Sequence, residues 1–156
     1  MGKTDLLNSA FKDAVTNTPD ISKGYMVGLT ALGKYSSKVT VSNTVKVEGS
    51  VDIDSTTVAL YPRENRWDYV IGFNGKVIFV EVHSATTSEV DAVLKKLDWL
   101  KNWLNSKAPD LAKLRAPEPY FWVQSKNFQI LKHSPQYRRA VQKGILPVSK
   151  VTLNPG

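Results

Sequence analysis

The chain of 156 residues contains no cysteine and no long run of apolar residues. The first absence excludes a disulfide framework, a thiolate zinc site, an iron–sulfur cluster and a cysteine nucleophile. The second leaves no segment that approaches the roughly 20 apolar residues of a membrane span. The first ten residues, MGKTDLLNSA, also lack the apolar core of a signal peptide. We therefore expect a cytoplasmic protein without a membrane segment, folded as one domain over residues 1–156.

Positive charge is unevenly distributed along the chain, whose net charge is +7. Residues 1–85 hold nine basic and nine acidic residues, whereas residues 86–156 hold twelve basic and five acidic ones. Since Lys and Arg dominate phosphate binding, the basic second half indicates a polyanionic partner, and nucleic acid is the partner that we expect. A solvated basic face without a partner is the alternative.

Apolar periodicity predicts a mixed α/β domain in the order helix, strands, helix, strand, helix. The predicted elements are a helix over 5–16 capped by Thr4, strands between Lys38 and Val82 that include Val58 and Leu60, a long helix capped by Ser88, a strand over 119–124, a helix after Ser134 and a strand over 148–153. Asn74-Gly75 predicts a tight hairpin between residues 67–73 and 77–82. Residues 20–36 fit either helix or strand. We thus expect an α/β single domain with a mixed, mostly antiparallel central sheet flanked by helices.

The hairpin from Trp67 to His83 is the predicted location of a functional site. Asp68 begins one strand and Glu81 lies near the end of its partner, so the hairpin brings the two carboxylates to one end of the sheet. Glu81 and His83 are two residues apart and therefore project from the same face of their strand. Carboxylate oxygens suit a hard divalent cation such as Mg²⁺ or Mn²⁺. We expect Asp68 and Glu81 to bind such a cation, with His83 beside them.

The pattern of Asp68, twelve residues, Glu81, one residue and His83, on two antiparallel strands followed by a long helix and a strand, resembles the PD-(D/E)XK nuclease-like (restriction endonuclease-like) superfamily. The resemblance covers roughly residues 1–130. It implies the restriction endonuclease-like fold, metal ligation by Asp68 and Glu81, and phosphodiester hydrolysis by a Mg²⁺- or Mn²⁺-dependent endonuclease or exonuclease. His83 stands where the family has a catalytic lysine, and a neutral imidazole can accept a proton but supplies no fixed positive charge.

Three alternatives to this interpretation are open at the level of sequence. Asp52, in GSVDID, competes with Asp68 for the role of first carboxylate. Lys76 on the same strand as Glu81, or Lys95 on the following helix, could replace the missing ammonium. The carboxylates and His83 could also form an ordinary polar strand end with no function.

The basic second half contributes further candidate residues. Those expected to contact nucleic acid are Lys95, Lys96, Arg138, Arg139 and Lys143. Trp99 and Trp103 lie outside the apolar stripe of the long helix, which indicates either a base-stacking surface or an apolar face covered by the C-terminal segment or by the second copy of a homodimer. The alternative function is a catalytically inactive protein of the same fold that binds nucleic acid or another protein, with the two tryptophans in the interface.

Overall fold

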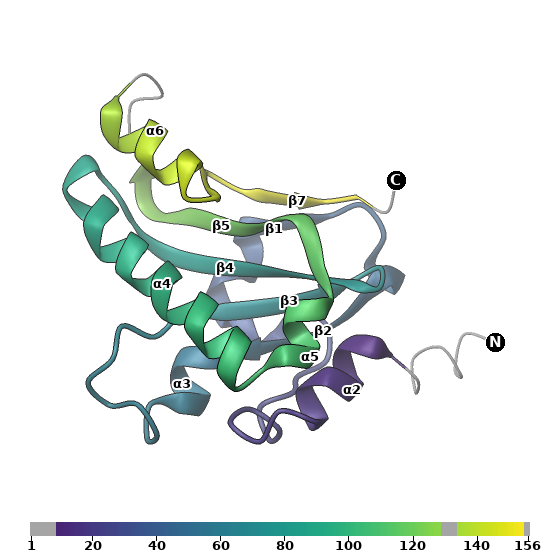
Figure 1. Ribbon diagram of the computed structural model, residues 1–156. Coiled ribbons are helices and arrows are strands. Elements are labelled where there is room, and N and C mark those ends of the chain that lie inside the picture. Colours follow the sequence, from purple (N-terminus) through teal and green to yellow (C-terminus); the bar gives the residue numbers. More distant parts are fainter. Residues whose placement is uncertain (1–8, 129–133, 155–156) are drawn as a thin grey trace.

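A five-stranded mixed sheet organises the computed structural model, which describes residues 9–128 and 134–154 (Figure 1). Its strands, in spatial order, are β2 (Val47–Asp52), β3 (Tyr69–Phe73), β4 (Lys76–Ala85), β5 (Arg115–Phe128) and β6 (Ile145–Val148). β2, β3 and β4 form an antiparallel meander, and β5 and β6 extend the sheet by parallel pairing. The predicted α/β class with a mixed sheet is confirmed.

The β3–β4 hairpin has the tight turn that Asn74-Gly75 predicts. Both residues have positive φ angles, 52° and 79°, and Phe73 pairs directly with Lys76 across the two-residue loop. The register then places Tyr69 opposite Val80. Asp68, one residue before β3, is thereby brought beside the next residue of β4, which is Glu81.

The helices lie mainly on one face of this sheet (Figure 1). They are α2 (Ala10–Thr16), α3 (Ile53–Thr57), α4 (Val90–Ser106), α5 (Pro109–Lys113) and α6 (Pro135–Gln142). α4 connects the parallel strands β4 and β5 and buries Val93, Leu97 and Leu104 in the core beneath it, as its periodicity predicts. Its N-cap residue is Glu89 and not Ser88, because a 3-10 turn over Thr87–Glu89 precedes the helix.

The opposite face of the sheet is covered by irregular and extended segments. A 3-10 segment, η1 (Thr30–Lys38), leads into β1 (Val39–Val41), which pairs in parallel with β7 (Val151–Leu153) in a separate two-stranded sheet. Residues of this layer pack on the apolar side chains that β3, β4 and β5 turn away from α4. The strand predicted over 148–153 is confirmed at Val151–Leu153, but it begins later than expected because a bend at 149–150 separates β7 from β6.

The segment around Val58 and the start of the first helix differ from the sequence-based predictions. Val58 and Leu60 are 42% and 55% exposed and follow α3, because the Asp52 carboxylate accepts a hydrogen bond from Ser55 N (2.9 Å) and starts a helix where a strand was expected. α2 begins at Ala10, and the predicted cap at Thr4 lies outside the described residues. None of the described helices has the length and hydrophobicity that a membrane crossing requires.

Candidate metal and catalytic site

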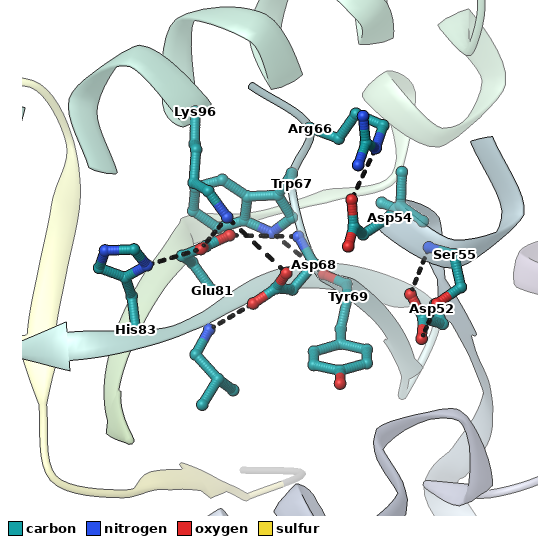
Figure 2. A network of polar contacts seen from close by, with 12 residues as sticks. Asp52, Asp54, Ser55, Arg66, Trp67, Asp68, Tyr69, Glu81, His83 and Lys96 are labelled. Carbon is teal, nitrogen blue, oxygen red and sulfur yellow. Dashed lines mark hydrogen bonds and ion pairs between the residues drawn. The ribbon is translucent and has the colours of Figure 1, made fainter. Parts of the chain in front are cut away.

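Asp68 and Glu81 hold each other in place at one end of the sheet (Figure 2). Glu81 Oε1 accepts a hydrogen bond from Asp68 N (3.2 Å), and Asp68 Oδ2 accepts one from Val82 N (3.0 Å). Each carboxylate therefore uses one oxygen on the backbone of the opposite strand. The second oxygens, Oε2 of Glu81 and Oδ1 of Asp68, both face Lys96. The predicted convergence of the two carboxylates is confirmed.

Both carboxylates are largely removed from water. The Glu81 side chain has no exposed surface, and that of Asp68 is 19% exposed. Burial raises the pKa of Glu81 well above its usual value, the neighbouring Asp68 charge adds to this effect, and Lys96 opposes it. Burial likewise raises the pKa of Asp68, against the influence of Lys96 and of the Val82 N–H. Two buried carboxylates this close are a costly arrangement, and such arrangements are concentrated at functional sites.

Lys96 of α4 is the cation of this site. Its Nζ lies 2.6 Å from Glu81 Oε2 and 3.9 Å from Asp68 Oδ1. Burial alone would lower the pKa of Lys96, but the charges of Glu81 and Asp68 outweigh it and raise that pKa. The ammonium is therefore a fixed positive charge at neutral pH. Lys96 was expected to contact nucleic acid; its side chain turns toward the sheet and pairs with Glu81, and a contact with nucleic acid stays a prediction.

The two lysines considered as replacements for the family's lysine do not reach the site. Lys76 begins β4 at the exposed hairpin turn, five residues from Glu81 and thus about 16 Å away along the strand. Lys95 is exposed and lines a hollow between α4 and α6. A helical spacing could have identified Lys96, which lies three residues after the buried Val93 and four before the buried Leu100.

His83 projects from the same face of β4 as Glu81, as predicted. Its Nδ1 lies 3.7 Å from Glu81 Oε2, and its Nε2 lies 3.1 Å from an oxygen of Glu89 at the start of α4. The His83 carbonyl accepts a hydrogen bond from the indole of Trp122 on β5 (3.2 Å), which fixes the backbone of this strand end. The contact of Glu89 with His83 depends on where α4 crosses the sheet.

Gln124 is a further residue at this edge that the sequence did not reveal. It pairs with His83 in the β4–β5 register, and neighbours in a parallel pair point to the same face of the sheet. Its Oε1 is buried and has no hydrogen-bond partner in the described part of the chain. An unpaired buried amide oxygen is unfavourable, so this atom is a position where a ligand or a water can be bound.

Asp52, the competing first carboxylate, has a structural role. Both of its oxygens accept hydrogen bonds from Ser55, one from the backbone N–H and one from the hydroxyl, each at 2.9 Å (Figure 2). Arg66 pairs with Asp54 (2.6 Å) and donates to the carbonyl of Tyr61 (2.6 Å). Arg66 therefore neutralises Asp54 and not Asp68.

The donor atoms at the site fit a hard divalent cation. Glu81 Oε2 and Asp68 Oδ1 converge on one position, which the Lys96 ammonium now approaches. Mg²⁺ is commonly held by one or two carboxylates, with waters and substrate phosphate oxygens completing its six ligands. Among the described residues, no group of three or more His, Asp or Glu side chains is arranged to hold a metal ion.

Three of the predicted nucleic-acid contacts share one surface. Lys95, Arg139 and Lys143 line a hollow of about 400 Å³ between α4 and α6, together with Asp91 and Asp98. Arg139 forms an ion pair with Asp91. Arg138 is exposed on α6, and its contact with nucleic acid, like that of the other three, stays a prediction.

Trp99 and Trp103 contact side chains from the first half of the chain, Tyr61, Glu64 and Asp20. Their rings are stacked with centroids 5.7 Å apart, and Tyr61 packs edge-on against Trp99. Trp103 is 3% exposed, so it is part of the core. Trp99 is half-buried and reaches the surface, and a homodimer through this face stays a prediction.

Comparison of the chain with models of protein families, with curated proteins and with solved structures found no match. The arrangement of Asp68, Glu81, His83 and Lys96 is therefore the main basis for a functional conclusion.

Proposed function

We propose that the protein is a metal-dependent nuclease that hydrolyses phosphodiester bonds in nucleic acid. The observation that carries the proposal is the position of the Lys96 ammonium at the two carboxylate oxygens of Asp68 and Glu81. The family that the sequence resembles needs two acidic metal ligands and a lysine. Here α4 supplies from Lys96 the positive charge that β4 lacks at His83, so all the required charges are within a few ångströms.

Each residue then has a definite task. Asp68 and Glu81 would hold the divalent cation, which would polarise a phosphate oxygen and lower the pKa of a bound water. Lys96 stabilises the negative charge that develops on the phosphate, because an ammonium fixed in a buried site acts more strongly than one in water. The hydrogen bonds of Asp68 and Glu81 to the opposite strand keep the oxygens that face the phosphate in position.

His83 is the proposed acceptor for the proton of the attacking water. A neutral imidazole that donates Nε2–H to Glu89 leaves Nδ1 as an acceptor, on the side of Glu81. Glu89 thereby orients the ring and stabilises the imidazolium that forms when Nδ1 takes up the proton.

One observation favours the alternative of a catalytically inactive binding protein. Lys96 already neutralises Glu81 at 2.6 Å, and a permanent ion pair of this kind could serve only to join α4 to β4. In that case the exposed cations Lys95, Arg139 and Lys143 would bind nucleic acid without cleaving it.

Cleavage of labelled single-stranded DNA, plasmid DNA and RNA with Mg²⁺, Mn²⁺ or EDTA tests the proposal. We expect the parent protein to show cleavage that depends on the cation. In Glu81→Gln and in Lys96→Met we expect the cleavage rate to fall by about 100-fold or more. Lys76→Met is the matched control, since it removes an ammonium from the hairpin turn and should leave the rate unchanged.

Cleavage that survives Glu81→Gln would place the activity outside this site. Absence of cleavage on every substrate, with nucleic-acid binding retained, would instead support the inactive binding protein.

A further inference from the structure

A small aromatic pocket lies between α4 and the segment that precedes Arg66. Its volume is about 180 Å³, and its lining residues are Tyr61, Glu64, Trp99, Asn102, Trp103, Ser106 and Lys107. The Trp99 and Trp103 rings are within 10° of parallel, and their 5.7 Å centroid separation indicates an offset stack. Tyr61 closes one side, with its ring at 74° to that of Trp99 and a centroid separation of 5.8 Å. The pocket therefore has flat aromatic walls.

Hydrogen bonds fix all three rings. Trp99 Nε1 donates to Glu64 Oε1 (2.7 Å), and Trp103 Nε1 and the Tyr61 hydroxyl both donate to Asp20 Oδ2 (3.0 and 2.6 Å). Burial and the bond to Asp20 raise the pKa of Tyr61 to about 12, so its hydroxyl remains a donor at neutral pH. The indole N–H groups are occupied and Trp103 is 3% exposed, so the rings that a ligand can contact are those of the half-buried Trp99 and Tyr61. A site fixed in this way loses little entropy when it binds.

The pocket and the carboxylate site share the same two walls. Trp99 lies three residues after Lys96 on α4, which puts the two side chains on one side of the helix and about 4.5 Å apart along its axis. The other wall is the segment that runs from Tyr61 to Asp68. Arg66 holds this segment in shape by donating to the Tyr61 carbonyl (2.6 Å). A ligand that spans both sites therefore needs to extend only a short way along α4.

We propose that this pocket binds one unpaired nucleobase of the strand whose phosphate is held at Asp68, Glu81 and Lys96. The inference rests on the proposed nuclease function and names its substrate class, which is single-stranded nucleic acid. A base can reach the pocket only when it is unstacked from its neighbours, as bases bound by aromatic side chains in other proteins are.

The chemistry of the rim favours a neutral planar ligand. Glu64 and Lys107 balance each other in charge, so neither an anion nor a cation is preferred, and Asn102 offers both a donor and an acceptor at the edge of the pocket. The pocket is smaller than the roughly 300 Å³ at which drug-sized sites begin. A single ring system with polar edges matches this size, these faces and this rim.

Binding of two matched oligonucleotides tests the proposal. The probes are 5′-labelled dT12 and a 12-residue abasic strand with the same phosphates, both measured by fluorescence anisotropy in EDTA so that no cleavage occurs. Trp99→Leu removes a stacking wall. Asn102→Phe fills the pocket from an exposed helix position and keeps all three rings, so it remains informative if Trp99→Leu unfolds. Met26→Ala, a change at an exposed apolar residue outside the pocket, is the control.

We expect Trp99→Leu and Asn102→Phe each to weaken dT12 binding about ten-fold and to leave the affinity for the abasic strand unchanged. Met26→Ala should bind both strands as the parent does. Equal affinity of the parent for the two strands, or equal losses on both strands in the variants, would overturn the base pocket.

Tryptophan fluorescence distinguishes a nucleobase from a cationic side chain as the occupant of the pocket. Quenching by thymidine monophosphate that is absent in Asn102→Phe supports the proposal. Quenching by tetramethylammonium but not by thymidine monophosphate would assign the pocket to a cationic side chain of a protein partner and overturn it.

Failure of this inference and failure of the nuclease function give different results. If the base pocket is wrong, cleavage that depends on Glu81 persists and Trp99→Leu leaves it unchanged. If the nuclease function is wrong, the parent cleaves nothing, whatever the state of the pocket.

Discussion

The ammonium of Lys96 lies 2.6 Å from Oε2 of Glu81, a carboxylate whose side chain has no exposed surface. One helix thus supplies the counter-ion for an acid on the neighbouring strand. A divalent cation that binds Glu81 must take the oxygen that Lys96 now contacts. Under the proposed function, binding of the cation at Glu81 would therefore release the Lys96 ammonium, and a phosphate of the substrate would accept the released charge.

Metal binding should depend on both carboxylates. We expect Asp68→Asn and Glu81→Gln each to abolish Mn²⁺ binding measured by isothermal titration calorimetry, because the cation loses one of its two charged protein ligands. Asp52→Asn is the matched control, since asparagine is an equally good helix cap and the Asp52 carboxylate accepts its hydrogen bonds from Ser55. Unchanged Mn²⁺ binding in the Glu81 variant would place the metal site elsewhere.

The Lys96–Glu81 pair should show strong energetic coupling. Lys96→Met leaves Glu81 buried without its counter-ion, and we expect the free energy of unfolding at pH 7 to fall by about 3 kcal/mol. The double variant Lys96→Met/Glu81→Gln should recover most of this loss, because the buried charge is then gone as well. Urea denaturation of the parent, of Lys96→Met and of the double variant measures these free energies of unfolding. Lys95→Met, at the exposed neighbouring position, should change stability by less than about 0.5 kcal/mol.

The buried acid should make the protein less stable as pH rises. Because the pKa of Glu81 is raised in the folded protein, the folded state holds this proton more tightly than the unfolded chain does. Its contribution to stability is therefore lost as pH rises from near 4.5, the ordinary value, through the raised pKa. Glu81→Gln lacks this loss, so its thermal midpoint relative to the parent should be higher at pH 8 than at pH 4.5. If the thermal midpoint of Glu81→Gln relative to the parent falls between pH 4.5 and pH 8, the effect of Lys96 on the pKa of Glu81 outweighs that of burial.

The positive charge of Lys96 should be transferable to position 83. Lys96→Met should abolish most of the cleavage. The double variant Lys96→Met/His83→Lys should cleave at least about ten-fold faster than Lys96→Met, because residue 83 faces the same Glu81 oxygen at 3.7 Å. His83→Lys alone should give no gain, since it places two ammonium groups at one carboxylate. Initial rates on single-stranded DNA measure the effect, and Lys96→Met/His83→Gln, without the charge, should stay inactive.

The basic surface should contribute affinity that depends on salt. Reversing the charges of Arg138, Arg139 and Lys143 to glutamate should make the plot of log affinity against log salt less steep for single-stranded DNA, by on the order of 2. Each cation that neutralises a phosphate contributes about 0.7 to this slope for single strands. A triple variant with the slope and affinity of the parent would show that this surface is only solvated.

Local sequence signals predicted the part of the fold that carries the site. Asn74-Gly75 requires two positive φ angles, which few dipeptides adopt easily, and this turn alone sets the register that joins Asp68 to Glu81. The strand expected at Val58 and Leu60 failed because Asp52 caps a helix before them. Alternating apolar residues predict a strand only where no capping side chain intervenes.

The rest of the site depends on contacts between distant segments. Glu81 and His83 could be found because they share a strand face, but the contact of Glu89 with His83 depends on the position of α4, and that of Gln124 on the parallel β4–β5 register. The spacing of Lys96 from the buried Val93 and Leu100 places it toward the packed side of α4, but its contact with Glu81 depends on how the helix packs on the sheet. Short-range patterns do not contain that second piece of information.

The pairing of β1 with β7 joins residues 39–41 to residues 151–153, more than one hundred positions apart. Val151 and Leu153 complete the layer over the face of the sheet opposite α4, where Ile71, Val80 and Val123 are packed. The η1–β1 segment that covers part of this face is made before the sheet, but its cover is complete only when residues 151–153 have been made and have paired with β1. Closure of this apolar face is therefore a late step, which joins an early segment of the described chain to a late one.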